Sequence, residues 1–298
     1  ALRLQTPEGR TLKDLRDRLN PRIGFNLHNQ NWRTSVGEPP RPASISVLSV
    51  AFDTGRTENA GRRMTQKLCA VVRDSLEPFA SGQIGKYDEA FEVRAFGDNL
   101  TLWGTPVILI ETGAYPSSEP DPPLVRLNFI GILSALDSLA TGTVDKADPK
   151  RYETLPPNES KEMYIVVHDA NVVSGSGIAP FLGDIGINAT RRVRRVDGKR
   201  EIVLASSIAD VGDLRTAGAL RTIDATNLVA APLFDPSLKE GQEVRLPDWK
   251  SHPAAHTIAP GQPAALVLLK PVGDPSRPAD LYRVELVINP SGTDSQSH

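Results

Sequence analysis

The hydrophobic pattern of this chain changes its period near residue 140, and no other feature of the sequence constrains the fold as strongly. Before that point, apolar residues recur at helical spacing in some segments and form continuous strand-like runs in others. These patterns predict helices at 11–19, 59–76 and 122–140, and strands at 22–28, 44–52 and 106–110. Strands interleaved with amphipathic helices favour an α/β fold, with a mixed sheet flanked by helices over residues 1–140.

The pattern after residue 140 is different. Segment 141–161 contains three prolines and has no hydrophobic period, so we expect it to be a linker. Beyond it, short apolar runs separated by Gly, Pro, Asn and Asp predict strands at 164–167, 184–187, 202–205, 228–231, 265–269 and 281–288. This spacing predicts a second, all-β domain, sandwich-like, over residues 162–290, followed by a polar tail at 291–298.

Charge and composition exclude several classes of function. The 34 basic and 36 acidic side chains give a net charge of −2, which provides no field for holding nucleic acid. The single cysteine, Cys69, rules out an internal disulfide and a cysteine-based metal site. The most apolar predicted helix, 122–140, is interrupted by Arg126 and Asp137, so we expect no membrane span.

The N-terminus has neither an initiator Met nor the apolar core of a signal peptide. We therefore expect the chain to be a processed product or a portion of a longer protein.

Two residues at predicted strand ends are candidates for chemistry. His28 is followed by an Asn-rich turn, a position from which an imidazole can bind a metal or transfer protons. The alternative for His28 is a side chain satisfied by neighbouring backbone groups. Glu111 directly follows the apolar run Pro106–Ile110, where partial burial raises a carboxylate pKa and suits it to general-base catalysis. The alternative for Glu111 is an ion pair with a surface arginine.

Residues 20–140 resemble the second half of a carboxypeptidase A-like zinc carboxypeptidase, of the funnelin superfamily. The resemblance rests on His28, the run Ser46–Asp53, the helix that begins near Asn59, and Trp103–Gly113. It implies that His28 is the third zinc ligand and that Glu111 is the general base acting on zinc-bound water. It also implies that a tyrosine, for which Tyr87 is the best match, closes over a peptide substrate.

The chain departs from that family where the metal is held. The family takes its first two zinc ligands from a His-x-x-Glu motif upstream of the third, and no His of this sequence has Glu three residues later. Because catalytic zinc needs about three protein ligands, we expect the isolated chain to bind no zinc tightly. Zinc would belong to a complete parent protein, with the missing ligands on an upstream half or a partner chain.

Residues 162–290 resemble the small β-domain of metal-dependent amidohydrolases. The resemblance rests on Tyr164–Gly177, Leu182–Ile187, Thr222–Pro232 and Thr257–Leu269. In those enzymes a metal-bearing barrel with a His-x-His motif interrupts the β-domain. Here the run that follows Pro232, Leu233–Lys239, contains no His. Only about 25 residues separate Pro232 from Thr257, too few for a barrel, so the resemblance implies the β-domain alone.

Two further features favour ordinary surface roles. His252 and His256 have a spacing that could clasp a metal on a helix, but the surrounding prolines favour a solvated loop. The basic run 191–195 is followed by Asp197 and Glu201, so we expect a solvated strand face or hairpin.

The sequence thus supports two hypotheses. In the first, the chain is part of a zinc metallocarboxypeptidase-like peptidase and is inactive alone; in the second, it is a non-catalytic two-domain remnant that binds other proteins. Under the first hypothesis, the resemblance alone implies that the parent protein is periplasmic or secreted.

Overall fold

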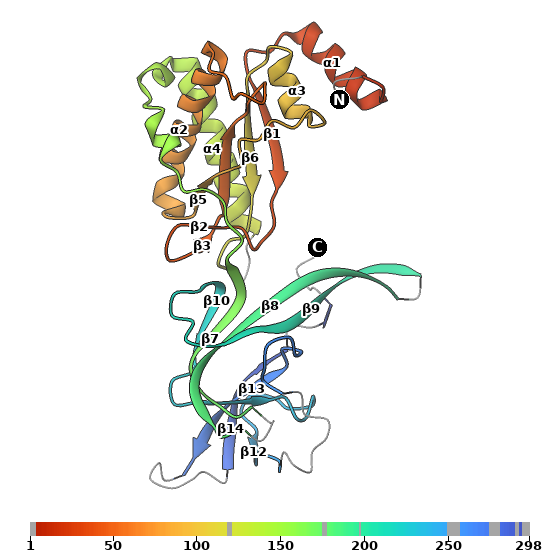
Figure 1. Cartoon of the computed structure of the whole chain (residues 1–298), viewed down its shortest axis with the longest axis vertical. Coiled ribbons are helices and arrows are strands. Elements are labelled where there is room, and N and C mark those ends of the chain that lie inside the picture. Colours follow the sequence, from red (N-terminus) through yellow and green to blue (C-terminus); the bar gives the residue numbers. More distant parts are fainter. Residues whose placement is uncertain are drawn as a thin grey trace. The chain divides into compact units, whose positions relative to one another are not determined.

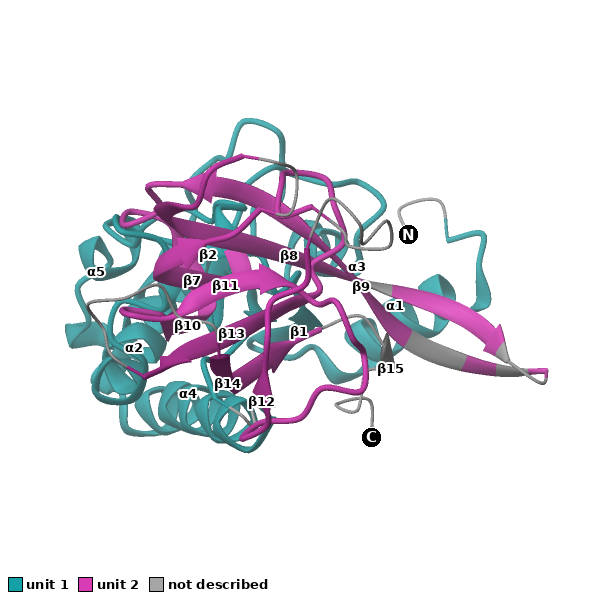
Figure 2. Ribbon diagram, turned by 90° about the horizontal axis from the view of Figure 1, so that it is seen from below, with its two compact units in different colours: residues 1–162 teal, residues 163–298 magenta. Residues whose placement is uncertain are grey.

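The computed structural model describes residues 4–117, 121–174, 178–196, 198–248, 257–273, 281–289 and 292–293. His252 and His256 lie outside the described residues, as does most of the expected tail. The chain divides into two compact units, residues 1–162 and 163–298, coloured separately in Figure 2. Each unit is described by itself.

Unit 1 is built on a four-stranded mixed sheet in its described residues (Figure 1). The strand order is β1 (Gly24–Asn29), β6 (Val107–Thr112), β4 (Ile45–Ser49) and β5 (Ile84–Lys86). β1 is parallel to β6, β6 is antiparallel to β4, and β4 is parallel to β5. The two short strands β2 (Ser35–Val36) and β3 (Arg41–Pro42) pair separately. The mixed sheet predicted from the sequence is confirmed.

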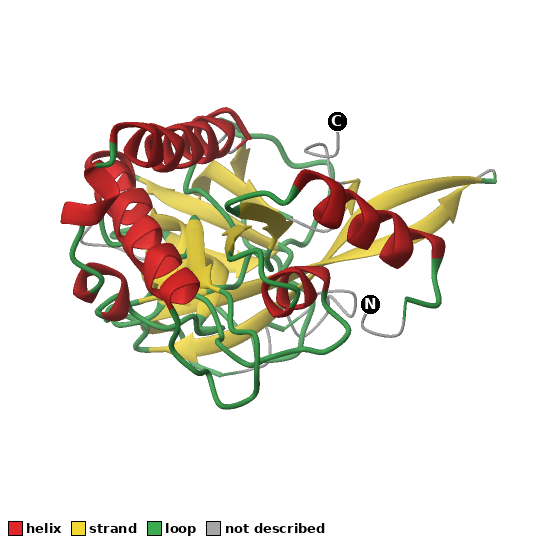
Figure 3. Cartoon of the chain, turned by 90° about the horizontal axis from the view of Figure 1, so that it is seen from above, coloured by secondary structure: helices red, strands yellow, loops and turns green. Residues whose placement is uncertain are grey.

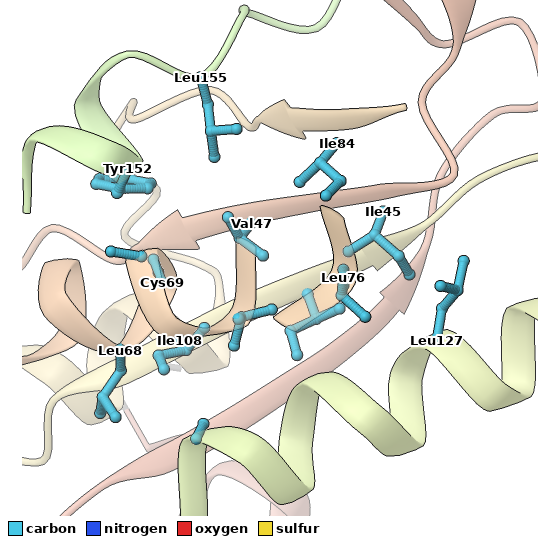
Figure 4. Close-up of a cluster of buried hydrophobic side chains, with 14 of the residues drawn as sticks. Ile45, Val47, Leu68, Cys69, Leu76, Ile84, Ile108, Leu127, Tyr152 and Leu155 are labelled. Carbon is cyan, nitrogen blue, oxygen red and sulfur yellow. The ribbon is translucent and has the colours of Figure 1, made fainter. Parts of the chain in front are cut away.

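Two long helices, α2 (Ala60–Ala80) and α4 (Asp121–Thr141), pack against each other on one face of this sheet (Figure 3). Asn59 caps α2, because its side chain accepts a hydrogen bond of 2.8 Å from the Arg62 N–H. Gly131 lets the helices approach closely, since a Cβ there would lie 3.2 Å from Val72. Leu68, Leu76, Ile45, Val47, Ile108 and Leu127 form the buried core between helices and sheet (Figure 4). Two shorter helices, α1 (Pro7–Leu19) and α3 (Phe96–Leu102), complete this part of the unit.

The segment predicted as a linker is instead part of unit 1. It forms a 3₁₀ turn, η1 (Thr143–Lys146), and a short helix, α5 (Lys150–Glu153). Val144, Tyr152 and Leu155 are buried in the same core as α2. The Tyr152 hydroxyl also accepts a hydrogen bond of 3.1 Å from the Ser49 N–H. Three separate anchors with no common period leave no pattern in the sequence, which is why the prediction failed here.

Unit 2 contains only strands in its described residues, and they form one nine-stranded sheet. The strands are β7 (Glu162–Val172), β8 (Phe181–Val196), β9 (Lys199–Gly212), β10 (Gly218–Asp224), β11 (Val229–Pro232), β12 (Glu243–Val244), β13 (Leu266–Val272), β14 (Leu281–Ile288) and β15 (Gly292–Thr293). The order is β12-β14-β13-β11-β7-β8-β9-β15, with β10 paired to β7. The predicted all-β region is confirmed, as an open sheet rather than a barrel.

The β8–β9 hairpin is the longest pairing in unit 2 and extends outward from it in Figure 1. The basic run predicted to be solvated lies on its first strand. Arg192, Val193, Arg194 and Arg195 are all exposed there. The hairpin prediction is therefore confirmed.

Among the described residues, one helix has the length and composition to cross a membrane. It is α4, whose most apolar window has a mean hydropathy of 1.4, with 22% of that window buried. Leu124, Leu127 and Ala135 on its inner side belong to the unit 1 core. The helix is therefore an element of the packed unit that also presents a large outward surface.

Candidate functional site

The two faces of the unit 1 sheet differ in what covers them. Side chains alternate along β6, so Ile108 and Ile110 enter the core beneath α2 and α4. Val107 and Leu109 lie on the opposite face, in a smaller cluster with Leu48, Val50, Leu100 from α3, and Tyr87. By the same alternation Glu111 belongs to this second face, at the end of β6 beyond that cluster.

His28 and Glu111 are neighbours on that second face. They are register partners in the parallel β1–β6 pair, so their side chains project from the same side of the sheet. Glu111 is only 6% exposed, whereas His28 is exposed. Burial raises the pKa of Glu111, and the nearby charge of His28 lowers that pKa in part. The result is a buried carboxylate at the rim of the sheet with increased basicity, as the sequence predicts.

Tyr87 lies over the same face. Its N–H donates a hydrogen bond of 3.1 Å to the Val47 carbonyl, which fixes the chain just after β5. Burial raises the pKa of the Tyr87 hydroxyl, and the charges of Glu111 and Asp88 raise it further. Tyr87 and Glu111 are therefore within electrostatic reach of each other. The fold brings the three residues singled out from the sequence to one region of one sheet face.

A ring of polar side chains beside Glu111 has no counterpart in the sequence analysis. Ser46 is the register partner of Glu111 on β4. Gln30 donates from Nε2 to Ser46 Oγ (3.1 Å), Ser46 donates to Asn158 Oδ1 (2.8 Å), and Asn158 donates from Nδ2 to Gln30 Oε1 (2.8 Å). Gly85 gives this ring its space, because a Cβ there would lie 2.5 Å from Asn158 Oδ1. Gln30 lies in the Asn-rich turn that drew attention to His28, but Asn158 sits in the presumed linker and gave no signal.

The residues present do not fit a catalytic zinc ion by themselves. Among the described residues, no group of three or more His, Cys, Asp or Glu side chains is placed to hold a metal. His28 would provide one donor, and a carboxylate that acts as a base is not free to serve as a ligand. No chemical step is therefore derived through zinc in this chain.

A second polar region of unit 1 lies at the start of α2, in a pocket of about 280 Å³. Four of its charged groups pair with one another. The buried Arg62 guanidinium lies 3.1 Å from Glu89 and 3.8 Å from Glu58, and Lys86 also pairs with Glu89. Internal pairing of this kind indicates a structural ion-pair cluster that holds the start of α2.

The contact between His168 and Asp184 in unit 2 also has a structural explanation. His168 Nδ1 lies 3.4 Å from Asp184 Oδ2. Asp184 is buried and accepts hydrogen bonds from the N–H groups of Asp169 (2.9 Å) and Leu214 (2.8 Å). These bonds tie β7 to β8 and to the turn after β9, beside a bulge in the β7–β8 pairing.

Comparisons with known proteins assign no family. No known protein family and no curated protein matches the chain. Similar solved structures include the N-acyl-D-glutamate deacylase from Bordetella bronchiseptica complexed with zinc and a phosphonate inhibitor, at 20% identity over 24% of this chain and 12% of that one, with a TM-score of 0.18. A D-aminoacylase that defines a novel subset of amidohydrolases is 26% identical over 24% of this chain and 11% of that one, with a TM-score of 0.17.

This chain thus spans 12% or less of the length of either structure. The second of these structures is described as an amidohydrolase. Structural similarities this small support no conclusion about function. The resemblance of residues 20–140 to zinc carboxypeptidases stays a proposal.

Proposed function

We propose that unit 1 is the part of a metal-dependent hydrolase, of the carboxypeptidase type, that carries the general base. Glu111 is the base, His28 is a metal donor, and Tyr87 contacts a peptide substrate. The observation that supports this most is the register pairing of a buried, basic carboxylate with an exposed imidazole on one sheet face. The chain alone is expected to be inactive, because its described residues hold too few metal donors.

The chemistry open to these residues is proton transfer. Burial makes the Glu111 carboxylate a better proton acceptor than an exposed one, so it can take a proton from an attacking water and return it to a leaving amine. When no metal is bound, the nearby charge of His28 favours the ionised form of Glu111. The ring of Gln30, Ser46 and Asn158 holds the β4 side of this region fixed.

A titration with zinc tests the donor assignment on the chain as it stands. After dialysis at neutral pH we expect no stoichiometric zinc by elemental analysis. Added zinc should bind weakly and perturb the NMR signals of His28 and Glu111 first, and His28→Ala should abolish that perturbation. The matched control is His168→Ala in unit 2, which should change nothing. About one tight zinc per chain, or perturbation confined to other residues, contradicts the proposal.

The base assignment is tested in an active form, meaning the longer parent or a reconstituted complex. There Glu111→Gln should nearly abolish release of C-terminal residues and leave the zinc content unchanged, because an amide cannot accept the proton. The matched control is Glu162→Gln, a second buried glutamate of unit 1 that lies outside the site. Near-normal turnover of the Glu111→Gln variant would contradict the assignment and would show that Glu111 is a strand-end carboxylate without a catalytic role.

A second candidate function is the non-catalytic binding module. The observation that favours it is the outer edge of β1: the strand lies at the end of the sheet order, no described segment pairs with that edge, and residues 27–29 are exposed.

A further inference from the structure

The β8–β9 hairpin concentrates positive charge on a chain that is acidic elsewhere. Segment 191–200 contains six basic side chains and one acidic one, a net charge of +5. The whole chain carries −2, so the remaining residues carry −7. Arg192, Arg195 and Arg200 are exposed, and no side-chain carboxylate that the structure describes pairs with any of them. These three cations are therefore available to a ligand of opposite charge.

Two of the arginines lie against each other. Arg195 and Arg200 are register partners in the antiparallel β8–β9 pair, so their side chains project from the same face of the hairpin. Like charges directly opposite one another on paired strands are destabilising. A carboxylate bound beside them would replace this repulsion with attraction. The pair therefore favours an anionic ligand on that face.

The outer edge of β8 continues past its partner strand (Figure 1). β7 pairs with residues 181–187 of β8, and no described strand pairs with the same side of residues 191–196. These six residues span about 20 Å. A strand of similar length from another molecule could pair along this edge.

The backbone groups on that edge can be identified from β9. Ile208 donates from its N–H to the Gln262 carbonyl and accepts from the Gly261 N–H, at 2.8 Å each, so its backbone groups face away from β8. The β8–β9 register has no shift between the Ile187–Ile208 pair and the hairpin turn. Alternation along both strands therefore turns the N–H and C=O groups of residues 191, 193 and 195 toward the outer edge. These groups can pair with an added strand without disturbing the hairpin.

We propose that this edge binds an extended acidic segment of another protein, which joins the sheet as a further strand beside β8. Its backbone pairs with the outward groups of residues 191, 193 and 195, and its carboxylates lie beside the arginines. The run Arg191–Arg195 reads the same in both directions, so its complement is Glu-Glu-Val-Glu-Glu, with the central valine opposite Val193. Val193 is 68% exposed and gives that valine an apolar contact. The inference concerns unit 2 alone and does not rest on the proposed function.

Charge favours an acidic segment over the other occupants. A second copy of β8, paired antiparallel about Val193, would place Arg192 of each copy opposite Arg194 of the other, which is repulsive. A neutral strand would leave the repulsion between Arg195 and Arg200 in place. A nucleic acid has no backbone N–H and C=O ladder to pair with the edge, and the −7 charge of the remaining residues repels a long polyanion.

The test is the binding of a fluorescein-labelled peptide that contains Glu-Glu-Val-Glu-Glu to the full chain, measured by fluorescence anisotropy. We expect saturable binding at one site per chain, weakened about tenfold or more by Arg192→Glu and by Arg195→Glu. Arg221→Glu, at an exposed arginine of β10, makes the same change of charge elsewhere in unit 2 and should leave binding unchanged. Absence of binding, or an equal loss in all three variants, overturns the proposal.

A proline variant separates strand pairing from attraction between charges. Val193→Pro removes an N–H that faces the outer edge, while the β8–β9 bonds made by residues 192 and 194 remain, so the hairpin should tolerate it. We expect it to weaken peptide binding about tenfold or more, whereas Val193→Thr, which keeps the N–H and the β-branched shape, should bind as wild type does. Far-UV circular dichroism checks that each variant folds.

Two outcomes of this comparison would overturn the proposal. Val193→Pro that binds the peptide as tightly as wild type would show that the backbone edge is not used. An oligothymidylate of equal charge that binds as tightly as the peptide would show that the hairpin holds any polyanion by charge alone.

Discussion

The two faces of the unit 1 sheet bury their side chains in different ways. Under α2 and α4, burial is mainly apolar: Ile45, Ile108 and Leu76 are fully inaccessible and belong to one hydrophobic cluster. On the other face, α3 covers only part of the sheet, and the remainder holds Glu111 beside His28 and a polar ring. One face therefore supplies stability, and the other carries a carboxylate at a cost to stability. Glu162, at the start of β7, is another buried carboxylate.

The largest effect is expected under the helices. Ile108→Ala should lower the free energy of unfolding by about 2–5 kcal/mol, because it leaves a cavity in a fully buried site that α2 and α4 cannot close. Urea unfolding followed by circular dichroism measures it. The paired control is Leu109→Ala, on the opposite face beside partly buried Tyr87 and Leu100, which should cost less. Equal losses would remove the distinction between the faces.

The next effect concerns Glu162, which is 0% exposed and whose carboxylate oxygens have no hydrogen-bond partner among the described residues. Burial raises its pKa to about 7, above the ordinary value of 4.5. The folded state then binds the proton more tightly than the unfolded state, so stability is full below pH 4.5 and falls as pH rises to about 7. Glu162→Gln should be more stable than wild type above that range by up to about 3 kcal/mol.

The Glu162 prediction is measured by urea unfolding at several pH values. The difference between Glu162→Gln and wild type should disappear below pH 4.5, where the wild-type carboxyl is already neutral. A difference that stays constant across the whole pH range would show that Glu162 is paired in solution.

A smaller effect of the same sign is expected for Glu111. Its pKa is also raised by burial, but His28 offsets part of the shift. Stability should therefore fall as pH rises from the ordinary glutamate pKa through the raised one, and Glu111→Gln should remove that fall. The same pH series of unfolding curves measures it. A stability that rises with pH in the wild type and not in the variant would mean that Glu111 is held as a stabilised ion.

The smallest effect is on the pKa of Glu111 itself. His28→Ala removes the charge that lowers this pKa, so the Glu111 carboxyl should titrate at higher pH than in wild type. Carbon-13 NMR titration of the side-chain carboxyl gives the value directly. His168→Ala is the control and should leave the Glu111 titration unchanged. An unshifted Glu111 in His28→Ala would mean that the two side chains do not share one site.

The sequence by itself determined the local elements and the residues at their ends. The period-3.6 pattern of 59–76 and 122–140 and the apolar run before Glu111 correspond to α2, α4 and β6, because hydrophobic spacing is a local property of the chain. The same local patterns identified His28 and Glu111 as side chains at strand ends. The position of Glu111 after an apolar strand also indicated that burial raises its pKa.

Only the tertiary structure decided which distant residues meet. The β1–β6 register sets His28 beside Glu111, although the two lie 83 residues apart in the chain. Asn158 reaches the same region from a segment without any hydrophobic period, held there by the β5 edge. Pairing across a sheet is fixed by the packing of the whole unit, and no local pattern encodes it.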